Sequence, residues 1–261
     1  MSMTRAEKAA RLRALHVPGD PLVLPNIWDA ASARIVESAG FPVVATGSAA
    51  IAPVLGYADG EGTPIGEMMA AIARIASAVG VPVTADVERG YGAPPAELVE
   101  RLCATEAVGC NIEDSDPVTG AMIDIGEQAD LVAAVRGAAR GADSDLVVNA
   151  RVDSFLNGSG TPEERLADAI ERGRRYLAAG ADCVYPIFVT DPGMIRTLVE
   201  ELGGPVNVLF RPGVPSIARL ADLGVARVSF GHGLHSATQD FTARMVAAIK
   251  EGRSPYPPKE T

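Results

Sequence analysis

Hydrophobic and polar positions divide the chain into two alternating kinds of segment. Short β-branched runs, typical of buried strands, are followed by longer Ala-rich segments whose apolar residues recur with helical spacing. The strand-like runs are PLVLPN, FPVVATG, VPVTADVE, GCNIEDS, LVVNARVD, ADCVYPIF, PVNVLF and ARVSFG. Strands that are apolar on both faces and joined by helices predict a parallel sheet. About eight such units predict an α/β fold of the closed (β/α)8 TIM-barrel type, with a doubly wound open sheet as the alternative.

The segment boundaries carry residues that suit helix ends. Thr161, Pro162 and Glu164 offer an N-cap hydroxyl, a first-turn proline and a capping-box glutamate. Glycines near the starts of predicted strands suit left-handed helix C-caps: Gly40, Gly80, Gly109, Gly180 and Gly224. Because no linker divides the chain, residues 1–261 are predicted to form one domain, with an N-terminal helix in 1–20 and a C-terminal helix and tail at 234–261.

The composition is that of an ordinary globular protein, with 48% hydrophobic and 21% charged residues. The formal net charge of -10 argues against a nucleic-acid partner, because such binding rests on Lys and Arg that neutralise phosphates. The N-terminus has no long apolar stretch, so neither secretion nor a membrane anchor is expected. Cys103, Cys110 and Cys183 lack CxxC spacing and fit buried, reduced thiols, so we expect a cytoplasmic location.

Polar residues gather where the predicted strands end, which is where barrel enzymes place their chemistry. In chain order these residues are Asn26, Asp29, Thr46, Gly47, Ser48, Asp86, Glu88, Glu113, Asp114, Arg151, Asp153, Asn207, Arg211 and His232. Strand ends are polar in many proteins, and that alone accounts for Ser, Thr and Asn. It accounts poorly for several converging carboxylates, whose mutual repulsion must be offset by a cation or a proton.

A metal site is the first interpretation of these carboxylates. Asp86 and Glu88 stand two positions apart, so a strand would direct both to one side, and Glu113 ends the next strand. Oxygen ligands without a nearby Cys or paired His favour a hard cation, Mg2+ by default, with Mn2+ possible. The alternative is that these carboxylates are exposed or pair with Arg89 and Arg151.

Two further strand ends suggest groups that bind an acid. Arg151 can hold a substrate carboxylate bidentately, and its alternative role is an ion pair with Asp153 or Glu113. Gly47 and its small neighbours can bring backbone N–H groups close to a developing oxyanion, although a tight strand-to-loop turn would also explain the glycine.

The three histidines give weaker signals. His232 follows the last predicted strand and is a weak candidate for chemistry, because a lone histidine there is at least as often a structural hydrogen bonder. His16 and His235 are expected at surface or helix-cap positions.

The order of these motifs resembles the isocitrate lyase/phosphoenolpyruvate mutase superfamily over nearly the full length of the chain. The resemblance rests on PNIWDAASARIVESAGFPVVATGS, LGYAD, ADVERGYG, NIEDS, NARVDSF and ERLADAIERGRRYLAAGAD, which occur in the family's order. Each motif alone would be weak, whereas their joint order is specific.

The resemblance implies a (β/α)8 barrel, usually a homotetramer, with the last helix swapped between subunits. It implies Mg2+ on Asp86, with Glu88 and Glu113 reaching it directly or through water, and a 2-oxo carboxylate chelated to the metal. The other site residues, as substrate-binding or catalytic groups, would be Thr46, Gly47 and Ser48 for the oxyanion, Arg151 for substrate charge, Asp59 near the reacting end, and Asn207 for substrate.

The chain also departs from the family. The lyases carry a Lys-x-Cys-Gly-His loop, in which Cys supplies a proton, but the corresponding loop here, residues 115–128, contains neither Cys nor His. We expect this loop to be mobile and to close without delivering that proton. Ile187 stands where the lyases have Glu and the phosphonate mutases have His. Glu88 replaces an Asp, which lengthens that ligand by one methylene.

Three functions follow as hypotheses. The first is a Mg2+-dependent lyase or decarboxylase that acts on a 2-oxo or 2-hydroxy di- or tricarboxylate, such as oxaloacetate, through an enolpyruvate-type intermediate; loss of CO2 suits a site without the acid. The second is carbon–phosphorus chemistry of the phosphonopyruvate hydrolase or phosphoenolpyruvate mutase kind. The third is a non-catalytic barrel that binds a small acid. In each case the partner is a small molecule, with no nucleic acid and no membrane.

Overall fold

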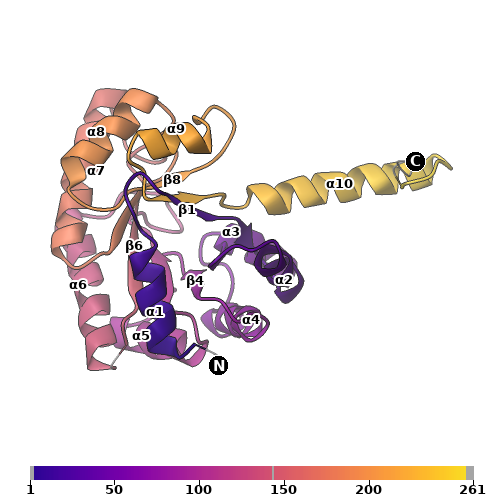
Figure 1. The fold of residues 1–261 in the computed structure, drawn as a ribbon, viewed down its shortest axis with the longest axis horizontal. Coiled ribbons are helices and arrows are strands. Elements are labelled where there is room, and N and C mark those ends of the chain that lie inside the picture. The colour runs from indigo at the N-terminus through magenta and orange to yellow at the C-terminus, as the bar shows by residue number, and fades with distance from the viewer. Residues whose placement is uncertain (1–2, 143, 257–261) are drawn as a thin grey trace.

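The computed structural model describes residues 3–142 and 144–256 and shows parallel strands alternating with helices in a TIM-barrel-like α/β fold (Figure 1). The strands are β1 (Leu22–Leu24), β2 (Asn26–Ile27), β3 (Val44–Thr46), β4 (Val83–Asp86), β5 (Gly109–Ile112), β6 (Val147–Val152), β7 (Cys183–Pro186), β8 (Asn207–Leu209) and β9 (Arg227–Ser229). The helices are α1 (Arg5–Ala14), α2 (Ala30–Ser38), α3 (Ser48–Leu55), α4 (Ile65–Ser77), α5 (Pro95–Ala104), α6 (Ile125–Gly141), α7 (Pro162–Ala178), α8 (Pro192–Leu202), α9 (Ile217–Asp222) and α10 (Gly233–Lys250).

The strands pair in sequence order around a ring, but in two sheets rather than one closed ladder. One sheet has the order β2-β3-β4-β5-β6-β7 and the other has the order β1-β9-β8. β1 and β2 are two halves of one extended stretch interrupted at Pro25, which has no N–H to donate; the first half pairs with β9 and the second with β3. On the other side, a single parallel bridge between Val184 and Val206 connects β7 with the start of β8. The predicted α/β barrel topology is therefore confirmed, whereas an uninterrupted closed ladder is not formed by the described residues.

The predicted helix-end signals are confirmed in part. Thr161 accepts a hydrogen bond from the backbone of Glu164, whose side chain accepts one from the backbone of Thr161, so the capping box is present. Three of the predicted glycines take left-handed conformations, with φ of 89°, 107° and 87° at Gly40, Gly180 and Gly224. Gly80 and Gly109 do not; Gly109 instead opens β5.

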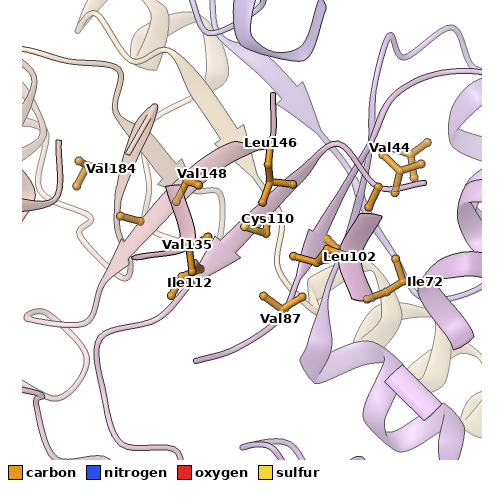
Figure 2. Close-up of a cluster of buried hydrophobic side chains, with 14 of the residues drawn as sticks. Val44, Ile72, Val87, Leu102, Cys110, Ile112, Val135, Leu146, Val148 and Val184 are labelled. Carbon is orange, nitrogen blue, oxygen red and sulfur yellow. The ribbon is translucent and has the colours of Figure 1, made fainter. Parts of the chain in front are cut away.

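The core fills the space between the strands and the surrounding helices. In Figure 2, Ile112 of β5 lies beside Val135 of α6, and Cys110 lies near its β6 neighbour Val148. Cys110 and Cys183 are fully buried, as predicted, whereas Cys103 is half-buried; all three are free thiols. This packing fixes the directions in which the strand ends point.

The first and last helices lie outside the alternating pattern. α1 buries Ala9 and Leu12 against Val108 and Val147, which lie near the starts of β5 and β6, so it packs on the amino-terminal end of the ring. α10 projects away from the rest of the chain in Figure 1. No described helix has both the length and the hydropathy needed to cross a bilayer.

Candidate active site

A cavity of about 550 Å3 opens at the carboxyl ends of the strands, the end at which (β/α)8 enzymes carry out their chemistry. The predicted metal-binding, substrate-binding or catalytic residues that line it, besides the strand-end residues Asn26, Arg211 and His232, are Gly47, Ser48, Asp59, Asp86 and Arg151. They come from the ends of β3, β4 and β6 and from the loop between α3 and α4. Sequentially distant strand ends thus supply one polar surface.

Asp86 is the best-oriented carboxylate on this surface. Its Oδ2 accepts hydrogen bonds from the backbone N–H and the hydroxyl of Ser48, at 3.1 and 2.9 Å. Its backbone N–H donates to the hydroxyl oxygen of Thr46 at 2.9 Å. The other carboxylate oxygen, Oδ1, is buried and has no hydrogen-bond partner. A buried carboxylate oxygen is costly without a partner, so this atom marks a position where a ligand or a cation belongs.

The backbone at Gly47 differs from the predicted oxyanion pocket. The N–H of Gly47 donates to the carbonyl of Ile27 at 3.2 Å, and the N–H of Ser48 donates to Asp86. Neither N–H is therefore free to bind a substrate oxyanion. Gly47 is extended, with φ of -134°, so a tight turn does not explain it either. It is the N-cap of α3, whose next residues, Ser48 and Ala49, line the cavity. The positive end of that helix therefore faces the site.

Thr46 and Asn207 lie beneath the cavity rather than on its wall. Their exposed fractions are 1% and 0%, and neither is among the lining residues. Thr46 positions Asp86, as described above, and Asn207 accepts a hydrogen bond from the hydroxyl of Ser229 at 3.1 Å. In this structure both side chains therefore support the cavity from below, and direct contact of either one with substrate stays a prediction.

The three predicted metal ligands are not assembled as a ready-made site. Among the described residues, no group of three or more His, Cys, Asp and Glu side chains is arranged to hold a metal ion. Glu113 forms an ion pair with Arg151. Glu88 accepts a hydrogen bond from the backbone of Glu61, and another from the Tyr91 hydroxyl at 3.0 Å.

The charge balance nevertheless favours a cation or a proton. Burial, followed by the nearby charge of Asp86, raises the pKa of Glu88 to about 7. The same two causes raise the pKa of Asp59. Burial also raises the pKa of Glu113 well above its ordinary value, although Arg151 acts in the opposite direction. With the orphaned oxygen of Asp86, this oxygen-only, over-negative donor set fits a hard divalent cation.

Arg151 is held on two sides by carboxylates. Its Nε and Nη2 donate to Asp153, at 2.6 and 3.1 Å, and its Nη1 donates to Glu113. Asp153 also accepts a hydrogen bond from the hydroxyl of Ser115 and carries no exposed side-chain surface. The ion pairs considered as an alternative role for Arg151 are therefore present, and they fix its guanidinium at the cavity wall. Arg89, by contrast, pairs with Glu127 and not with the site carboxylates.

The loop at 115–128 supplies no acid to the cavity. Asp116 accepts hydrogen bonds from the backbone of Val118 and from Thr119, and Asp124 caps the start of α6. Neither carboxylate is among the lining residues. The loop sequence has no Cys or His that could donate a proton, and neither Asp116 nor Asp124 takes over that task in this structure.

Two kinds of residue at the site could not be recognised from the sequence. The first is apolar: side chains from the ends of β7, β8 and β9 also line the cavity, and apart from Ile187, noted as a departure from the family, they looked like ordinary core in the sequence. The second is Asn26, noted as a strand-end residue but given no role. Its Nδ2 donates to the Thr46 carbonyl at 2.8 Å, and its Oδ1 accepts from the backbones of Phe230 and Gly231. Asn26 thereby joins the two sheets at the cavity.

The histidines also differ from expectation. His232 lines the cavity at the start of α10. His16 and His235, expected at the surface or at helix caps, are each only 7% exposed. His235 packs edge-on against Trp28, with ring centroids 5.0 Å apart, and His16 hydrogen-bonds to the carbonyl of Leu12 at 2.8 Å.

Comparison with known proteins gives consistent similarities. Residues 12–250 match the model of the phosphoenolpyruvate phosphomutase family. An uncharacterized protein of Mycobacterium tuberculosis is 34% identical, covering 91% of this chain and 88% of that protein. Oxaloacetate decarboxylase of Rhodopseudomonas palustris is 28% identical, covering 97% and 88%. The crystal structure of a Burkholderia cenocepacia protein, proposed to be a phosphonomutase, superposes with a TM-score of 0.88 at 41% identity and covers 92% of this chain and 99% of that one.

Proposed function

This chain belongs to the phosphoenolpyruvate phosphomutase family, within the isocitrate lyase/phosphoenolpyruvate mutase superfamily of lyases and mutases, and from that premise we propose that it is a Mg2+-dependent lyase or decarboxylase. Its substrate would be a 2-oxo or 2-hydroxy di- or tricarboxylate, cleaved through an enolpyruvate-type intermediate. Oxaloacetate is the first candidate, because oxaloacetate decarboxylase is among the relatives.

The observation that carries this proposal is the buried, unpartnered Oδ1 of Asp86. Ser48 occupies the other oxygen and fixes the carboxylate, so Oδ1 is the oxygen available to a cation. Asp86 would hold Mg2+, or Mn2+, directly, and Glu88 and Glu113 would act through water or after rearrangement. When bound, the cation supplies Lewis-acid polarisation of a 2-oxo group.

The chain's own residues perform the remaining tasks in this proposal. Arg151, fixed between Asp153 and Glu113, offers its guanidinium edge to substrate negative charge. The amino-terminal end of α3, at Ser48 and Ala49, adds a favourable field for an anion. Asp59 lines the cavity, has a raised pKa and forms no ion pair among the described residues, so it can exchange a proton there.

Decarboxylation is favoured over cleavage that needs a dedicated acid. The 115–128 loop holds its Asp116 and Asp124 in local turns and caps, and it has neither Cys nor His. Loss of CO2 requires no protonation of the leaving group, and the enolate can take its proton from solvent or from Asp59.

Carbon–phosphorus chemistry is the second candidate, and the similarity to the proposed phosphonomutase supports it. A transferring phosphoryl group needs several cationic or donor groups around it. Arg151 is already engaged by two carboxylates, which leaves Arg211 and His232 as the other basic side chains in the described lining. Because few basic side chains remain to bind a phosphoryl group, we rank the second candidate below the first.

One panel assay tests both candidates. Purified protein is incubated with Mg2+ and, separately, with oxaloacetate, 2-methylisocitrate, 2,3-dimethylmalate and phosphonopyruvate, and pyruvate release is followed. We expect Mg2+-dependent release from oxaloacetate that EDTA abolishes. Release from phosphonopyruvate alone would support the second candidate, and Mg2+-dependent binding without turnover of any compound would support a non-catalytic acid-binding barrel.

Assembly and location are proposed on the resemblance. We propose a homotetramer in which α10 is exchanged between subunits. The exposed apolar side chains of Phe241, Val246 and Ile249 on the projecting helix support this arrangement, because such residues favour burial against a partner. We propose a cytoplasmic location because the three cysteines are free thiols.

A further inference from the structure

The cavity has two chemically different halves. The polar half contains Asp86, Ser48, Arg151 and Asp59, which the proposed function assigns to the 2-oxo acid. The rest of the described lining includes six apolar residues, here called the apolar wall: Leu156, Ile187, Phe188, Leu209, Phe210 and Phe230; Tyr185, Arg211 and His232 line the cavity as well. A compact dicarboxylate has no group that would make use of such a surface.

The apolar wall is a packed structure. Ile187 and Leu209 form a small cluster with Tyr185, separate from the main core, and Phe188 packs against it. Phe210 and Phe230, which pack against the main core behind this cluster, lie at a tilt of 43°, with ring centroids 5.2 Å apart. These side chains come from the ends of β7, β8 and β9, so the barrel itself holds the wall in place.

Phe188 gives a second, independent sign that the wall is functional. Its φ is 68°, in the left-handed region that a bulky residue rarely adopts. Backbone strain of this kind costs free energy and collects at ligand sites. At the same position Arg211 places its guanidinium 4.8 Å from the centre of the Phe188 ring, which keeps this exposed cation at the rim.

Ile187 and Leu209 themselves offer nothing to a second carboxylate, for which Arg211 and His232 are the basic side chains left in the described lining. Ile187 and Leu209, 8% and 7% exposed, would desolvate a charged group without offering it a donor. A methyl-branched or aromatic substituent gains from burial on the same surface.

We propose that the natural substrate carries a branched-alkyl or aryl substituent beyond its 2-oxo or 2-hydroxy acid head, and that the apolar wall selects it. This inference rests on the proposed function for the head group. It places Ile187, Phe188 and Leu209 as specificity-determining residues.

Isothermal titration of the full chain with Mg2+ present tests the proposal, using three acids with the same head: pyruvate, 2-oxo-4-methylpentanoate and phenylpyruvate. We expect the two larger acids to bind at least about tenfold more tightly than pyruvate, because each buries an apolar group. That ratio should shrink in Leu209→Ala and in Phe188→Ala, and should persist in Ile35→Ala, which truncates an exposed aliphatic side chain outside the cavity.

The possible results separate the two proposals. Equal affinities for the three acids, or a ratio that Leu209→Ala and Phe188→Ala both leave intact while their thermal unfolding remains cooperative, would overturn the apolar-wall inference alone. Failure of all three acids to bind would instead contradict the head-group site of the proposed function. Phe188→Ala provides the test if Leu209→Ala does not fold, because Phe188 is less buried than Leu209.

Discussion

Ser48 donates both its backbone N–H and its hydroxyl to a single oxygen of Asp86, at 3.1 and 2.9 Å, and leaves the other oxygen buried without a partner. The pair joins the end of β4 to the first turn of α3. A carboxylate fixed in this way presents one defined oxygen to a ligand.

Asp86→Ala should abolish Mg2+-dependent activity and metal binding, since it removes the fixed oxygen. Loss of a residue that only hydrogen-bonds to a metal ligand can lower metal affinity by roughly 100-fold. Loss of Asp86, the proposed ligand itself, should lower it by at least as much. The melting temperature should change little, because a half-buried strand-end carboxylate contributes little to the core. Metal titration calorimetry and thermal unfolding are the measurements, with the exposed Asp222→Asn as the matched control. A destabilised mutant with unchanged metal affinity would show that Asp86 is structural.

Arg151→Lys should lower kcat/KM by more than about tenfold, because a lysine ammonium cannot make the paired, bidentate hydrogen bonds that a planar guanidinium donates to a carboxylate. It should also lower stability, since Asp153 has no exposed side-chain surface and would lose most of its partner. Removing a partner from a buried pair costs about 3 kcal/mol or more. Steady-state kinetics and urea unfolding measure the two effects, and Arg174→Lys, in an exposed pair with Glu201, is the control. Unchanged kinetics would remove Arg151 from the site.

His16 should make the fold sensitive to acid. Burial, followed by the charge of Arg227, lowers the pKa of His16 to about 4 from an ordinary value of 6.5. Between these values the unfolded chain binds the proton more readily than the folded chain. Neutral His16 therefore makes its full contribution to the free energy of unfolding above pH 6.5. This contribution is lost as the pH falls toward 4, by about 2 kcal/mol between pH 7 and pH 5.

Urea unfolding at pH 7 and pH 5 checks the His16 prediction. The free energy of unfolding should fall from pH 7 to pH 5 by about 2 kcal/mol less in His16→Gln than in the parent chain. A parent and a variant with the same pH dependence would assign the acid sensitivity to other groups.

Thiol reagents should leave activity intact under native conditions. Burial raises the pKa of Cys110 and of Cys183 to about 12, so little reactive thiolate forms at neutral pH. Cys103 is half-buried and accepts a hydrogen bond from Arg5 far from the lining residues. Activity assays before and after iodoacetamide, with mass spectrometry to locate the label, test this expectation. Inactivation that follows labelling of any one thiol would place that thiol in the mechanism.

The sequence by itself determined the alternation of strands and helices, and with it the set of strand ends. Local periodicity is enough for this, because a buried parallel strand and an amphipathic helix leave different patterns in the chain. It also determined that Asp86, Ser48 and Arg151 meet at one cavity, because parallel strands end on the same side of a barrel. The capping box at Thr161 was readable for the same reason, since its partners lie within one turn.

Only the tertiary structure decided how individual side chains are directed and paired. Thr46 and Asn207 lie beneath the cavity because residues nearer the carboxyl ends of their strands form its lining, such as Leu209, two positions after Asn207 on the same side of β8. Glu113 forms an ion pair with Arg151, 38 positions away in the sequence, and no local sequence pattern contains such a contact. Ile187 and Leu209 line the cavity although their sequence context is that of core residues, because an apolar strand end looks the same in the chain whether it meets a helix or an open site.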